Sequence, residues 1–136
     1  MTRFNTTIAL AAVAALAVLG GCEKSSVTGE HGEKLTLVKP ADQSIKQGDS
    51  NKLGIAITRK NFDDAVEIEI TNLPSGVTVA NGARQTIPSG GMKLDSVTLV
   101  AAPDAALVKD HRVAVTARGP GGIAVTEHFE LDVEAK

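Results

Sequence analysis

The sequence predicts an all-β fold, an antiparallel two-sheet sandwich of about seven to eight strands that follows an N-terminal helix. From residue 34 onward, apolar side chains alternate with polar ones, and Val and Ile are concentrated in the apolar positions. Gly, Pro, Asn and Asp interrupt this alternation at short intervals, as turns between strands do. No segment of this part of the chain keeps the 3.6-residue period of an amphipathic helix.

The predicted strands follow one another with short connections. In chain order they cover residues 35–38, 53–57, 66–71, 77–80, 84–87, 97–101, 111–117 and 123–133. The clearest is 66–71, where Val and Ile alternate with Glu and Thr, so that one face of the strand is apolar. Pro40 ends the first strand, and the pair Asn81-Gly82 and the run Gly119–Gly122 predict hairpin turns.

The same alternation predicts the core. The chain has no Trp, no Tyr and only three Phe, so the core must be largely aliphatic. The side chains predicted to be buried are Leu37, Ile55, Ile57, Val66, Ile68, Ile70, Val97, Leu99, Val113, Val115, Phe129 and Leu131.

The chain divides into three parts. Residues 1–21 begin with a positive charge at Arg3 and contain an unbroken apolar run from Ile8 to Leu19. A helix of these 12 residues is about 18 Å long, well short of the roughly 30 Å hydrocarbon core, so it is typical of a cleaved signal helix. Residues 22–33 are polar and without period, which predicts a flexible tether. Residues 34–136 are long enough for one domain.

The only cysteine, Cys22, follows Leu19, Gly20 and Gly21 at the end of the apolar run. This arrangement resembles the lipobox of bacterial lipoproteins. The resemblance implies that a signal peptidase recognises Leu19, Gly20 and Gly21, that the Cys22 thiol receives a diacylglyceryl group, and that cleavage leaves Cys22 as the new N-terminus. The alternative is an ordinary secretory signal with an incidental buried cysteine, although an unpaired thiol is unusual in an exported protein.

A second resemblance extends over residues 34–135. The order Arg59, Phe62 and 66–70, then Leu73-Pro74-Ser75-Gly76-Val77, then 97–100 and 113–117, resembles bacterial immunoglobulin-like surface modules. This family implies adhesion, spacing or partner binding rather than catalysis. In such modules a Tyr often begins the penultimate strand. Here His111 stands in that place.

Composition and charge exclude several classes of partner and of chemistry from the prediction. The formal net charge is −2 and no Lys/Arg cluster occurs, so nucleic acid is not an expected partner. A carbohydrate site in which sugars stack on aromatic side chains is not expected, because only Phe62 and Phe129 remain after the signal segment. Ser75 and Ser89 lie in turn sequences, and no Gly-x-Ser-x-Gly elbow occurs. No catalytic residue and no cofactor are therefore predicted.

Metal binding has two weak candidates. His111 and His128 would need to approach each other across a hairpin, with Asp110 or Glu127 adding oxygen ligands, and His31 lies in the predicted tether. For a calcium ion, Asp63-Asp64 with Asp104 or Asp110 could supply oxygen ligands. These residues lack the Asp-x-Asp-x-Asp-Gly pattern of a dedicated calcium loop. No metal site is predicted.

Two further features of the strands carry charge. Glu67 and Glu69 share a polar face, as do Arg112 and Arg118, which predicts cross-strand ion pairs where these strands are neighbours. Glu127 interrupts the apolar series of the last strand. Either a bulge or an edge position would keep its carboxylate exposed to solvent, and of the two we expect a bulge.

These inferences predict a lipid-anchored protein of the cell envelope, on the periplasmic face of a membrane or on the cell surface. Its domain is expected to act as a binding, adhesion or structural module without catalysis of its own, with a possible protein partner in the envelope and a ligand that the sequence does not name. The alternatives are an accessory subunit of a larger envelope complex, or a small metal- or carbohydrate-binding protein.

Overall fold

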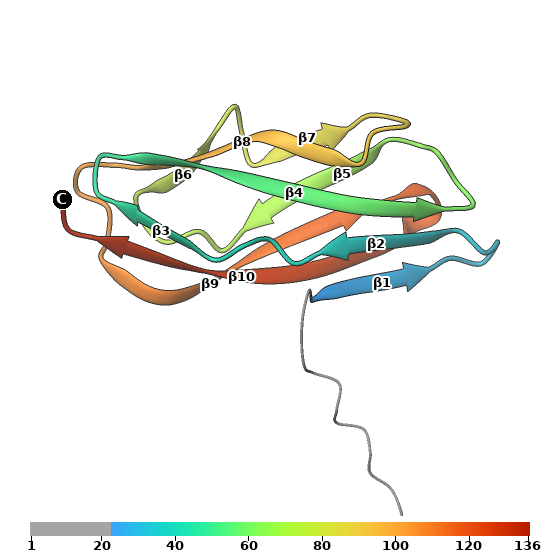
Figure 1. Cartoon of the computed structure of the whole chain (residues 1–136), viewed down its shortest axis with the longest axis horizontal. Coiled ribbons are helices and arrows are strands. Elements are labelled where there is room, and N and C mark those ends of the chain that lie inside the picture. The colour runs from blue at the N-terminus through green and yellow to red at the C-terminus, as the bar shows by residue number, and fades with distance from the viewer. Residues whose placement is uncertain (1–22) are drawn as a thin grey trace, which may run out of the picture.

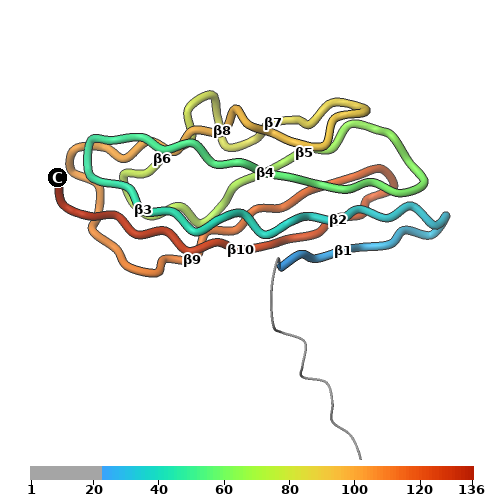
Figure 2. Tube along the Cα trace, in the orientation of Figure 1, coloured from blue at the N-terminus to red at the C-terminus, as the bar shows by residue number. Residues whose placement is uncertain are grey.

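A computed structural model describes residues 23–136, and these residues form ten strands (Figure 1). The strands are β1 (Lys24–Thr28), β2 (Lys34–Val38), β3 (Gln43–Lys46), β4 (Ser50–Lys60), β5 (Val66–Thr71), β6 (Val77–Ala80), β7 (Arg84–Ile87), β8 (Lys93–Ala101), β9 (Val108–Arg118) and β10 (Ala124–Glu134). A three-residue 3-10 turn, Pro120–Gly122, joins β9 to β10. The strands run along the long axis of the molecule, so most of the loops gather at its two ends (Figure 2).

The strands form two five-stranded sheets with the orders β1-β2-β4-β8-β6 and β3-β10-β9-β5-β7. Within these orders, β2-β4-β8-β6 and β5-β9-β10 reproduce the A-B-E-D and C-F-G sheets of a constant-type immunoglobulin domain. The remaining strands β1, β3 and β7 each extend a sheet at an edge. The fold is therefore the immunoglobulin-like sandwich that the sequence predicts, but it has ten strands rather than seven or eight, and β3 pairs with β10 in parallel rather than antiparallel.

The core lies between the two sheets and is aliphatic, as expected. All twelve side chains predicted to be buried are at most 4% exposed, and Phe129 is the one fully buried aromatic side chain among the described residues. No polar or charged side chain of residues 23–136 is fully buried. The prediction that β5 has one apolar face is confirmed, because Val66, Ile68 and Ile70 are buried.

The predicted tether is wrong for most of its length. Lys24–Thr28 form β1, which pairs antiparallel with β2 over five residues. Val27 packs against the core, and the carbonyl oxygen of Glu23 accepts the N–H of Lys39 at 2.8 Å. The folded part of the chain therefore includes Glu23, eleven residues before the predicted start of the domain at residue 34.

The Asn81-Gly82 pair does not form the predicted hairpin. Both residues have positive φ angles, as the tight turn requires, but β6 pairs with β8 and β7 pairs with β5. The turn thus carries the chain from one sheet to the other. The second predicted hairpin is confirmed, because β9 and β10 pair directly across Gly119–Gly122.

The signal helix, Leu19, Gly20, Gly21 and Cys22 lie outside the described residues. Within residues 23–136, no helix has the length and apolar character needed to cross a bilayer.

Candidate functional site

The candidate site is the edge of β10, in the part of this strand that is paired with a neighbouring strand on one side only. β3 pairs with β10 over Leu131–Glu134, whereas the first part of β10 pairs with β9 alone among the described residues. The cause is the link between β2 and β3. Pro40 lacks an N–H and ends β2 in one sheet, and the chain crosses before β3 joins the other sheet. β10 is therefore open from Ala124 to Glu130.

The backbone groups at this open edge have a defined direction. The carbonyl of Ile123 faces β9, because it accepts the N–H of Gly119 at 2.9 Å. The N–H of Glu130 faces the other way, because it donates to Asp42 Oδ1 at 2.8 Å. Since neighbouring residues of an antiparallel strand direct these groups to opposite sides, Ala124, Thr126 and His128 present their N–H and C=O groups to the open edge.

Glu127 lies beside this edge without the predicted bulge. It pairs regularly with Val115, and the irregularity of β10 falls between Leu131 and Val133 instead. Glu127 has the same parity as Phe129, so its side chain points between the sheets, and it is half-buried there. Ser25 Oγ of β1 donates to Glu127 Oε2 at 2.5 Å, which links the two sheets where no backbone pairing does.

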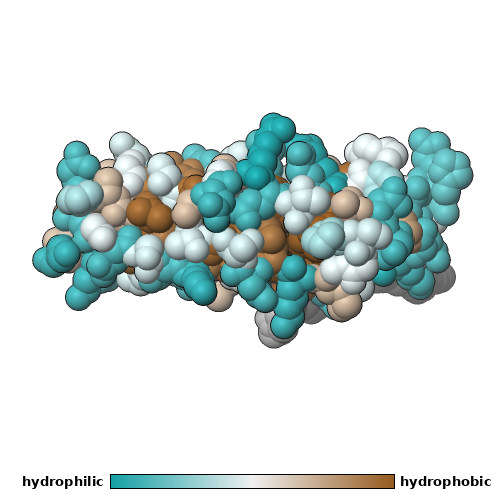
Figure 3. Space-filling view, turned by 90° about the horizontal axis from the view of Figure 1, so that it is seen from above, coloured by the Kyte–Doolittle hydropathy of each residue, from teal (hydrophilic) through white to brown (hydrophobic). Residues whose placement is uncertain are grey.

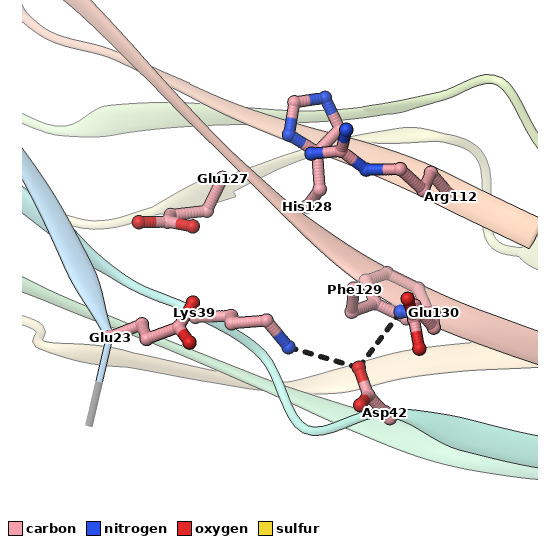
Figure 4. Close-up of a pocket in the computed structure, with 8 residues that line it drawn as sticks. All are labelled: Glu23, Lys39, Asp42, Arg112, Glu127, His128, Phe129 and Glu130. Atoms are coloured by element: carbon pink, nitrogen blue, oxygen red, sulfur yellow. Dashed lines mark hydrogen bonds and ion pairs between the residues drawn. The ribbon is translucent and has the colours of Figure 1, made fainter. Parts of the chain in front are cut away.

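Figure 4 shows the groove beside Glu127, at the edge of β10. Glu127, Glu23 and Lys39 lie on one side of the β10 ribbon, and His128 lies with Arg112 on the other. Two hollows of about 470 and 540 Å³ follow one another along the edge. Their charged side chains are acidic at Glu23, Glu30, Glu33, Asp42, Glu127 and Glu130 and basic at Lys39 and Arg112.

One ion pair closes the lower end of the groove. Lys39 Nζ lies 2.9 Å from Asp42 Oδ1, the same atom that accepts the N–H of Glu130. The hydrogen bond from Glu130, together with Lys39, lowers the pKa of Asp42. Asp42 is therefore an anion, and its carboxylate accepts the N–H of Glu130 that a neighbouring strand would otherwise bind.

The other carboxylates of the groove are less neutralised. Among residues 23–136, no basic side chain lies within ion-pair distance of Glu23, Glu127 or Glu130. Glu33 is involved in the turn that precedes β2, where hydrogen bonds from its own N–H and that of His31 lower its pKa. The groove thus has an excess of negative charge.

The histidines do not form a metal site among the described residues. His111 pairs with Leu131 and His128 with Ala114, so the two imidazoles lie at different levels of the β9–β10 ladder. His111 Nε2 is 2.7 Å from the carbonyl oxygen of Asn72, which ties β9 to the turn after β5 in place of a tyrosine contact. No group of three His, Cys, Asp or Glu residues in the described chain can hold a metal ion.

The predicted cross-strand pairs form between β5 and β9, with one change of partner. Arg118 lies 3.9 Å from Glu67 and 3.3 Å from Glu69, and Arg84 of β7 completes the cluster at 3.3 Å from Glu69. The hydrogen bond from Arg118 is the main cause that lowers the pKa of Glu69. Arg112 is not part of this cluster; it lines the groove instead.

The remaining candidates support loops. Ser89 Oγ donates to the carbonyl oxygen of Asp63 at 2.5 Å and lies 3.0 Å from Asp63 Oδ2. Arg59 donates to the carbonyl oxygens of Asp64 and Gly91 and thereby joins the loop after β4 to the loop after β7. The second calcium candidate, Asp110, donates its N–H to Asp132 Oδ1 at 2.7 Å.

Sequence reasoning missed Ser25 as part of the groove because a polar tether was expected where β1 forms. It missed Lys39 and Asp42 because they lie in the link between β2 and β3, which carries no periodic pattern. The one signal for the site was Glu127, a charged residue at an inward position of the last strand.

Comparisons with known proteins assign no function to the chain. No protein-family model matches the chain, and no curated protein matches it. Among solved structures, a chimeric titin Z1Z2 functionalized with a KLER peptide from decorin is 17% identical with a TM-score of 0.41, and the titin M3 domain is 13% identical with a TM-score of 0.39. Each match covers 84% of this chain and 99% of the other. The fold assignment rests on the strand order of this chain's own sheets.

Proposed function

We propose that this protein is a lipid-anchored protein of the cell envelope whose immunoglobulin-like domain is a binding or structural module without catalysis of its own. The observation that carries the proposal is the lipobox-like run that ends in Cys22, directly before the folded domain. In this proposal Cys22 is the first residue of the mature chain, and the lipid on its thiol is the attachment to the membrane. Two or more acyl chains anchor a protein stably, whereas one does so only marginally.

The early start of the domain supports a close attachment. Glu23 is held by Lys39, and a single residue spans at most about 3.6 Å. The chain enters the domain on one of its long sides, away from both ends of the molecule (Figure 1). An anchor at Cys22 would therefore hold the start of β1 close to the bilayer, rather than raise the domain on a stalk.

Cell fractionation with the Cys22→Ala variant tests the anchor. We expect the wild-type chain to sediment with membranes and to enter the detergent phase, and the variant to lose both properties. A Cys22→Ala chain that lacks residues 1–21 and still fractionates with membranes as the wild type does would contradict the proposal. Ser26→Ala, four residues further along, is the matched control and should leave the distribution unchanged.

The open edge of β10 favours a second candidate, an accessory subunit of a larger envelope complex. An unpaired strand edge can pair with another chain, and most natural proteins block such edges. Crosslinking in native membranes followed by identification of the linked peptides tests this candidate. Crosslinks from the groove to one defined protein support it, and a domain without crosslinks contradicts it.

A further inference from the structure

The groove at the edge of β10 combines two features that recognise the same kind of ligand. One is a row of backbone donors and acceptors at Ala124, Thr126 and His128, directed away from β9. The other is a lining in which six acidic side chains outnumber two basic ones. We propose that an extended segment of a partner protein, bearing Lys or Arg at alternate positions, adds to this edge as a further strand.

The backbone supplies the first part of the recognition. A strand laid beside residues 124–129 would continue the position that β3 occupies beside Leu131–Glu134. In strand addition, main-chain hydrogen bonds give affinity and alternate side chains give specificity. Asp42 already accepts the N–H of Glu130, so the free edge is the six residues from Ala124 to Phe129, about 20 Å at about 3.3 Å per residue, which is enough for a segment of about six residues.

The charge of the groove selects the segment. Glu23 and Glu127 lie toward β1, and Glu130 lies at the end where Asp42 already pairs with Lys39. Alternate side chains of an added strand point to opposite sides, and Glu127 and Glu130 lie on opposite faces of β10, so every second residue would be directed toward Glu23 and Glu127. Complementary charge fixes such a segment in register and excludes an acidic one.

Glu127 also argues against the simplest rival occupant, a second copy of this chain. An inward-pointing charge on an edge strand discourages pairing between identical edges. Two copies joined at this edge would bring Glu127 and Glu130 of each copy together, and like charges that face one another are destabilising.

Large exposed hydrophobic side chains do not gather in one patch on the described part of the chain. Figure 3 shows the side of the molecule that faces upward in Figure 1, where hydrophobic areas lie scattered among hydrophilic side chains. Met92 and Leu107, the large hydrophobic residues of the described chain that are strongly exposed, lie in different loops. The groove is therefore the surface on which structure and charge point to one class of partner.

Two synthetic peptides test this inference, Ac-(Lys-Val)₄-NH₂ and Ac-(Glu-Val)₄-NH₂. The ¹⁵N-labelled full chain in a nonionic detergent is titrated with each peptide, and backbone amide shifts and hydrogen exchange are followed by NMR. We expect the lysine peptide to shift the amides of Ala124, Thr126 and His128 and to slow their exchange. The glutamate peptide should leave them unchanged.

Variants separate charge from backbone pairing. Glu23→Gln should weaken the lysine peptide about two- to fivefold, as the loss of one exposed ion pair does, whereas Glu134→Gln, in the part of β10 covered by β3, should not. Thr126→Pro removes an edge-directed N–H without removing a bond to β9, and it should weaken binding about three- to tenfold. Its folding is checked from the amide spectrum of β9.

Three results would overturn the inference. In the first, neither peptide binds, which would leave Glu127 with a purely protective role. In the second, the lysine peptide shifts amides elsewhere. In the third, the amides of the edge shift with protein concentration alone, which would assign the edge to a second copy. None of these results bears on the anchor, because acylation of Cys22 is measured independently of binding.

Discussion

Asp42 shows how one side chain completes a sheet edge at the scale of a single residue. Its Oδ1 accepts the N–H of Glu130, a bond that a neighbouring strand would otherwise supply, and the same atom pairs with Lys39 Nζ. Both contacts favour the carboxylate over the neutral acid and lower the pKa of Asp42, with the backbone bond as the larger cause. The charge of this residue is therefore linked to the stability of the fold.

The sign of the linkage follows from the direction of the pKa. A carboxyl group with a lowered pKa in the folded state stabilises the protein above its unfolded pKa of about 3.9 and loses this effect as pH falls through the folded value. We expect Asp42→Asn to lower the free energy of unfolding by about 0.5–1 kcal/mol at pH 7, since the side chain is partly exposed. The difference from the wild type should shrink as the pH falls below about 4.

Urea titrations at several pH values measure this difference. The exposed residue Asp104, for which no hydrogen bond is recorded within the described chain, provides the control variant Asp104→Asn, which should be neutral throughout. A loss for Asp42→Asn that grows toward acid pH would have the wrong sign for this account.

At the scale of elements, the sequence identifies the strands that bury a full face and misses those that do not. Eight strands were predicted at their observed places because each carries at least one apolar side chain into the core amid clear turn signals. β1 and β3 were missed because each contributes only one such side chain, Val27 and Ile45; β7 also contributes one, Ile87, but the turn signals Asn81-Gly82 and Pro88 mark its two ends. These short strands are held by backbone pairing with β2 and with β10, and such pairing leaves no period in the sequence.

β5 provides a test of the core. Ile68 is 1% exposed and lies on a strand between β7 and β9. Ile68→Ala should cost about 2–5 kcal/mol of unfolding free energy, because it removes buried methyl groups and leaves a cavity. Chemical denaturation measures the loss, with the exposed Thr71→Ala on the same strand as the control. A cost for Ile68→Ala below about 0.5 kcal/mol would mean that Ile68 does not face the core.

β1 provides a test of the difference between a strand and a tether. If β1 pairs with β2 in solution, those amides of Lys24–Thr28 that point toward β2 should exchange with solvent on the order of tenfold or more slowly than an unstructured peptide. Hydrogen exchange followed by NMR gives this value residue by residue. Exchange at the unstructured rate throughout Lys24–Thr28 would mean that this segment is the flexible tether that the sequence predicts and not a strand.

At the scale of the whole molecule, the fold follows from the sequence but the groove does not. The groove exists because β2 belongs to one sheet and β3 to the other, and because β1 returns beside the uncovered half of β10. These are long-range arrangements, and only the inward parity of Glu127 marks them in the sequence. The ion-pair cluster of Glu67, Glu69 and Arg118 was predictable, because two polar faces of opposite charge required only that β5 and β9 be neighbours.

The anchor proposed at Cys22 connects the scales, since one thiol would fix the position of the whole domain at a membrane. The most direct test is mass spectrometry of the N-terminal peptide from the protein purified out of membranes. The account predicts a peptide that begins at Cys22 and carries diacylglyceryl on its sulfur. An unmodified Cys22, or a chain that retains residues 1–21, would contradict it.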